Sequence, residues 1–137
     1  MLAEGSVRYS LRQPLEQAIE SVCSSLRNQG MRVVGQLDVS RRIERSLGMI
    51  LAPCRIVFVL PGPTTLTAEA IHPWAAVFLP LHIVISGNDC QSEIQIPNRV
   101  QMVRGTVPLT VYSPVVEVQR QTLKAIEAIA VRSSILA

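Results

Sequence analysis

Charged side chains are scarce in this sequence. Only 17% of its 137 residues are Asp, Glu, Lys or Arg, whereas soluble domains average about 25%. With 48% hydrophobic residues, the chain carries more apolar side chains than a single domain of this size is expected to bury. The surplus predicts an apolar surface that is covered by a second subunit, by a ligand in a cavity or by a membrane. We favour the first of these and expect a homodimer.

Long hydrophobic runs are missing as well. The longest apolar stretch, from Trp74 to Ile85, is interrupted by Pro80 and His82 and is shorter than the roughly 20 residues that a spanning helix needs. The N-terminal residues MLAEGSVRYS lack the basic region and the continuous apolar segment of a signal peptide. We therefore expect no membrane span and a cytoplasmic location.

Cysteines are few and do not form a pattern. Cys23, Cys54 and Cys90 are odd in number, far apart and outside any CxxC spacing, which argues against a disulfide framework and fits a reducing compartment. A metal site needs three or four converging ligands, and only Cys54, Cys90, His72 and His82 are soft candidates. Because ten residues separate the two histidines, we expect no metal and no cofactor.

Aromatic residues are also rare, which limits nucleic-acid binding. Recognition of single-stranded nucleic acid requires aromatic side chains for stacking beside a basic stripe, but the chain has one Trp, two Tyr and two Phe. The run of Arg41, Arg42 and Arg45 fits a solvated helix face. The net charge of +3 does not change this, so we expect no nucleic-acid partner.

The sequence does contain a regular succession of strand and helix patterns. Alternating or β-branched runs predict strands over residues 7–11, 31–39, 54–60, 81–86 and 92–96. Helical spacing and stop signals predict helices over residues 15–28, 40–48, 63–72 and 113–130, with a proline near the start of three of them. Residues 97–112 have no dominant period.

These elements predict the class of fold. The run CRIVFVL, from Cys54 to Leu60, is nearly continuous in apolar residues and predicts a central strand buried on both faces. Asp38 stands where a cap of the second helix belongs. We predict a single α/β domain of the α+β kind over residues 1–137. It has a mixed sheet of about five strands, helices mainly on one face, and a C-terminal helix.

Several stretches resemble a family known only as domain of unknown function 302. They are the helix and strand PLEQAIESVCSSLRNQGMRVVGQLDVSRRIERSLG, the strand and turn CRIVFVLPGP, the strand entry LPLHIVIS and the hairpin end IQIPNRV, within residues 13–133. Family members commonly have Cys-Asn-Pro at the turn and Leu-Pro-Cys at the strand entry. Here Pro61 and Gly62 replace the first cysteine and the asparagine, and Leu81 replaces the second cysteine. The resemblance implies a compact, dimeric α/β domain without an established activity, and the two missing thiols argue against carrying over a thiol or metal role from the family.

The turn PGPTT is the strongest candidate for a ligand site. It follows a buried strand and opens a helix, so the backbone N–H groups and hydroxyls of Thr64 and Thr65 are available to an anion there. Gly62 allows another group to approach the backbone. We expect the pocket to be lined by Pro61, Gly62, Thr64, Thr65, His72, Trp74 and His82. The plainer interpretation, in which Pro61, Gly62 and Pro63 only stiffen a tight connection, is favoured over this one.

The leading hypothesis is therefore a non-catalytic, dimerising module that binds a small anionic or amphipathic molecule. The alternative is an enzyme or a thiol-dependent carrier, in which Cys54 is the nucleophile and His82 the base. A buried, inert thiol is the more common state of such a cysteine.

Overall fold

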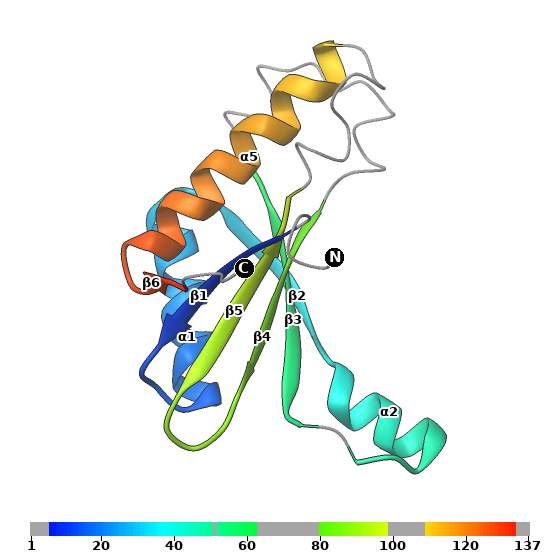
Figure 1. Cartoon of the computed structure of the whole chain (residues 1–137). Helices are drawn as coiled ribbons and strands as arrows, with labels where there is room; N and C mark the ends of the chain where they lie inside the picture. The colour runs from blue at the N-terminus through cyan, green and yellow to red at the C-terminus, as the bar shows by residue number, and fades with distance from the viewer. Residues whose placement is uncertain (1–5, 51, 63–79, 99–108, 134–137) are drawn as a thin grey trace.

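The computed structural model describes residues 6–50, 52–62, 80–98 and 109–133, with the side chains of the last helix described from Val115 onward. These residues form a six-stranded sheet with two long helices packed on one of its faces (Figure 1). The α/β class, the one-sided helical cover and the C-terminal helix are those that the sequence predicts. Among the described helices, none combines the length and the apolar character needed to cross a bilayer.

All the strand pairings described are antiparallel. The order across the sheet is β2-β3-β4-β5-β1-β6. The sequence predicts a mixed sheet of about five strands, whereas the described sheet has six strands and no parallel pair. The additional strand, β6, has only two residues, too few to show a pattern in the sequence. The strands are β1 (Ser6–Leu11), β2 (Arg32–Asp38), β3 (Cys54–Leu60), β4 (Leu81–Gly87), β5 (Ser92–Pro97) and β6 (Val131–Arg132).

Helix α1 (Leu15–Asn28) follows from its apolar spacing. Ala18, Ile19, Val22 and Leu26 recur on one side and are buried, because residues three and four apart share a helix face. Pro14 has an extended conformation and occupies the cap position, one residue before the helix.

Helix α5 (Leu109–Glu127) begins earlier than the sequence indicates. The predicted start at Ser113 and Pro114 is wrong, since Pro114 lies in the second turn. A proline lacks the backbone N–H that an interior helical position uses, so it is normally found in the first turn of a helix. For this reason Ser113 and Pro114 indicate a helix start in the sequence. The predicted helix over residues 63–72 lies outside the described part of the chain.

The core lies between the sheet and helices α1 and α5. Alternate residues of the strands point into it, among them Tyr9, Val57, Ile83 and Ile94, all fully buried. The other residues of β3 face the opposite side and are only partly buried. Strand β3 is therefore interior to the sheet, as predicted. The prediction that it is buried on both faces is wrong, because only one of its faces is fully buried.

Candidate functional site

Helix α2 (Val39–Leu47) extends away from the rest of the chain (Figure 1). Asp38 accepts a hydrogen bond of 2.9 Å from the backbone N–H of Arg41, as predicted for a cap, and this bond lowers the pKa of the carboxyl group. Gly48 ends the helix with a φ of 69° and donates its N–H to Glu44 at 3.0 Å. No residue of this helix is buried.

One side of α2 and the residues after it form an apolar surface. Leu47 is 67% exposed, Met49 54% and Ile50 85%. Next to them is a groove of about 260 Å³, lined by Val39, Ile43 and Leu47 on one side of the helix and by Leu37 on β2, together with Arg42 and Ser46. We call this groove, together with the exposed Met49 and Ile50, the α2 surface. Groove and projecting side chains therefore lie on the same short segment.

The sheet has a second face, turned away from α1 and α5. One row of directly paired residues crosses it from β2 to β1: Leu37, Ile56, Val84, Gln95 and Arg8. The row is apolar on β2, β3 and β4 and polar on β5 and β1. Phe58 lies beside Ile56 on β3, on the same face.

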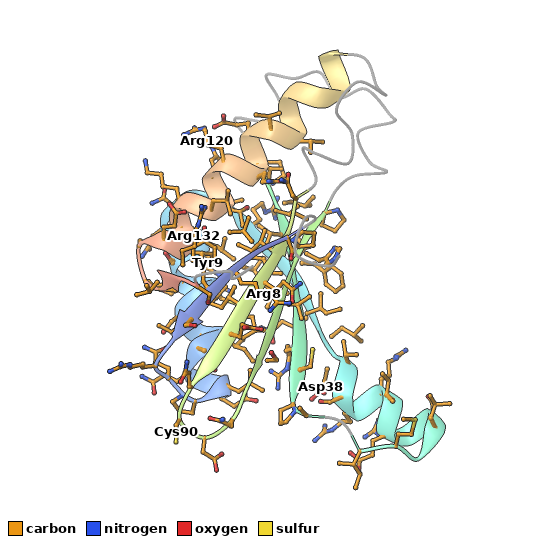
Figure 2. The ribbon with its side chains drawn as sticks, viewed as in Figure 1. Arg8, Tyr9, Asp38, Cys90, Arg120 and Arg132 are labelled. Atoms are coloured by element: carbon orange, nitrogen blue, oxygen red, sulfur yellow. The ribbon has the colours of Figure 1, made fainter. Side chains whose placement is uncertain are left out.

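Arg8 is the cation at the end of this row, and it lies over the middle of the sheet in Figure 2. Its Nε is shielded from solvent and has no hydrogen-bond partner. The ion pairs found between described residues do not include Arg8. Such an unpaired charged donor, held away from water, is costly for the isolated chain.

Of the predicted ligand site at the PGPTT turn, the structure describes Pro61, Gly62 and His82. Pro61 is buried, and a Cβ added to Gly62 would lie 2.4 Å from the carbonyl oxygen of Gly30. The glycine thus allows the turn after α1 to approach the backbone, which supports the structural interpretation of this position. Thr64, Thr65, His72 and Trp74 lie outside the described residues, so the site as a whole stays a prediction.

His82 lies on the second face of the sheet, paired with Phe58 across β3 and β4. Cys54 pairs with Ser86, four residues further along β4, which corresponds to about 13 Å along a strand. The structure therefore does not bring Cys54 and His82 within hydrogen-bond distance. Burial, with a contribution from Asp38, raises the pKa of the Cys54 thiol, the opposite of what a nucleophile needs.

Cys54 instead lines a small polar pocket of about 260 Å³ between the starts of α1 and α2. Arg55 crosses this region, with Nη2 2.7 Å from Glu16 and 3.8 Å from Asp38. Its charge is thus already balanced by two carboxylates. No group of three metal-ligating side chains occurs in the described ranges.

Of the second face, the sequence indicated only His82 as a candidate site residue, and the row from Leu37 to Arg8 was missed. Arg8 sits in an ordinary alternating strand, and only the insertion of β1 between β5 and β6 aligns it with Gln95 and Val84. The α2 surface could have been found from the sequence, because Ile43 and Leu47 lie in a helix whose other residues are mostly charged or small, and Met49 and Ile50 follow it directly.

Comparison with known proteins agrees with this architecture. The family model described as domain of unknown function DUF302 matches residues 7–129. The crystal structure of an uncharacterized conserved DUF302 protein from Bacillus stearothermophilus superposes with a TM-score of 0.78 at 16% sequence identity, covering 90% of this chain and 97% of that one. No curated protein matches the sequence.

Proposed function

The chain belongs to the DUF302 family, and we propose that it is a non-catalytic module that forms homodimers through the α2 surface. The observation that carries the proposal is the exposure of Leu47, Met49 and Ile50 beside an apolar groove. Apolar side chains gathered in this way mark an interaction surface.

The length of α2 supports the same conclusion. The helix has nine residues, none of them buried, and helices shorter than about 12 residues are marginal in water without packing against a neighbour. A partner that covers Ile43 and Leu47 would supply the missing contacts. The helix is therefore expected to gain stability upon association.

The partner we propose is a second copy of this chain. A two-fold interface uses the same patch on both subunits, so it must be complementary to itself. The α2 surface has both parts, a groove beside Ile43 and projecting side chains at Met49 and Ile50. Two helices of about 14 Å bury less than the roughly 800 Å² per subunit of a stable interface, so residues 49–50 and Leu37 must take part.

The cysteines bear on the location of the protein and on the thiol alternative. All three cysteines are free, which suits the cytoplasm. The alternative, an enzyme or carrier that uses Cys54, is less well supported, because the pKa of that thiol is raised and His82 lies at a distance along the sheet.

Light scattering on the purified chain tests the dimer. We expect a dimeric mass at micromolar concentration for the wild type and a monomeric mass for Leu47→Asp. Burying a leucine is worth about 2 kcal/mol, and symmetry places Leu47 in the interface twice, so the dissociation constant should rise by a factor of about 100 or more.

The matched control is Val131→Asp on β6, since Val131 is 74% exposed and lies away from α2. This variant should remain dimeric. A monomeric wild type across the micromolar range, or a dimeric Leu47→Asp, would refute the proposal.

A further inference from the structure

We infer that the second face of the sheet binds a small organic anion with an apolar body, whose carboxylate pairs with Arg8. The site is centred on Arg8, at the opposite end of the row from Leu37, which belongs to the α2 surface. It deepens the ligand-binding part of the expected function. It does not require the dimer, because Arg8 and the strands around it belong to one chain.

The anionic end of the ligand follows from the surroundings of Arg8. Its Nε is buried and unpartnered, and three of its nearest neighbours on this face are uncharged: Ser6 and Ser10 along β1 and its direct partner Gln95 on β5. Gln95 donates to the Ser6 hydroxyl at 3.0 Å, and Ser10 is bonded to Ser133 at 3.0 Å. Neither of these hydrogen bonds involves the guanidinium of Arg8, which is left for an incoming anion. A carboxylate matches its fork of N–H donors.

The nearest acidic residue on this face does not form an ion pair with Arg8. Glu93 lies on the same face of β5, two residues along from Gln95 and directly opposite Ser10. It is exposed, and the ion pairs between described residues do not join it to Arg8. The positive charge of Arg8 is therefore not neutralised by the adjacent strand.

The apolar end of the ligand follows from the other residues of the row. Val84 lies two strands from Arg8, or about 10 Å away, and Ile56 lies one strand beyond it. With Phe58 they form a partly exposed apolar surface. A carboxylate at Arg8 thus allows an aliphatic chain to lie across β5 onto β4 and β3.

Calorimetric titration of the full chain with octanoate tests this inference. Acetate lacks the apolar body, octanol lacks the charge and octylamine has the opposite charge. We expect octanoate to bind, the other three to bind at least tenfold more weakly, and affinity to rise up to about fourfold for each methylene added from butanoate to octanoate.

Two variants locate the site. Arg8→Met should weaken octanoate binding at least tenfold, whereas Arg12→Met, an exposed arginine just beyond the same strand, should leave it unchanged. Circular dichroism confirms that both variants are folded. If Arg8→Met does not fold, Val84→Thr serves instead and should weaken octanoate but leave acetate unaffected.

The inference is overturned if octanoate does not bind, if octanol binds as well as octanoate, or if the folded Arg8→Met variant binds normally. Light scattering on the same samples keeps the two proposals apart. A monomer that binds octanoate through Arg8 would refute only the dimer, and a dimer that does not bind octanoate would refute only this site.

Discussion

Tyr9 on the first strand and Glu127 at the end of the last helix are joined by a hydrogen bond of 2.7 Å from the tyrosine hydroxyl to Oε2. Arg132 on β6 lies 3.1 Å from the same oxygen, and its guanidinium carbon is 5.7 Å from the centre of the Tyr9 ring (Figure 2). Residues that are 118 positions apart in sequence thus fasten α5 and the short edge strand to the sheet.

Removing the Tyr9 hydroxyl should weaken this connection. We expect Tyr9→Phe to lower the free energy of unfolding by about 1 kcal/mol, the usual net value of a hydrogen bond whose partner is partly solvated. Urea denaturation measures the change. Arg120→Gln removes an exposed ion pair with Glu117 on the same helix and should have no measurable effect, so an equal loss in both variants would contradict the assignment.

The raised pKa of Tyr9 leads us to expect a loss of stability at alkaline pH. Burial raises the pKa of Tyr9 above its ordinary value of 10.0, Arg132 opposes the shift and Glu127 adds to it. An unfolded tyrosine loses its proton first, so the stabilisation is complete below about pH 10 and disappears as the pH rises through the folded pKa. The difference in stability between wild type and Tyr9→Phe should therefore shrink above pH 10. A constant difference would argue against it.

Gly62 should be intolerant of any side chain. Its added Cβ would stand 2.4 Å from the Gly30 carbonyl oxygen, a backbone atom that can yield only if the turn after α1 shifts. We expect Gly62→Ala to cost about 2 kcal/mol or more, in the range of overpacked interior sites. Gly35→Ala is the matched control, since its Cβ would meet only the Phe58 ring at 4.0 Å.

Thermal denaturation compares the two glycine variants. Gly35→Ala should keep a melting temperature within about 2 °C of the wild type, because a contact at 4.0 Å needs no adjustment. Equal melting temperatures for both variants would show that the turn at Gly62 can move away from Gly30.

The three cysteines should react in order of exposure. Cys90 is exposed on the hairpin, Cys54 is partly buried and Cys23 is buried, and burial raises the pKa of both Cys54 and Cys23. Because the thiolate is the reactive form, DTNB at neutral pH should label Cys90 first, Cys54 more slowly and Cys23 only upon unfolding. Cys90→Ser should remove the fast phase. A fast phase that persists and is lost in Cys54→Ser would favour the thiol-carrier alternative.

Much of the fold was predictable because its signals are local. The apolar spacing of α1, the alternation in β4 and β5 and the cap at Asp38 depend on residues within one or two turns of each other. The start of α5 was not predictable in this way, because the sequence around Pro114 does not show whether the proline lies within a helix or at its first turn.

For the candidate sites too, the sequence indicated some features and the structure added others. The sequence indicated a homodimer through its lack of charge, and the structure directs the proposal to the α2 surface, where Leu47 and Ile50 are exposed. The ligand site that the sequence predicts around PGPTT remains a prediction. The position of Gly62 against Gly30 shows why a glycine there need not signal a ligand.

The sequence by itself determined the class of the fold, the main elements and the family, because periodicity and turn residues act over short distances along the chain. Only the tertiary structure decided that β1 lies between β5 and β6, and with it that Arg8 stands in line with Gln95, Val84 and Ile56. The reason is that strand pairing depends on the burial of one common face by residues far apart in sequence. The opposite face then receives whichever side chains that register places there.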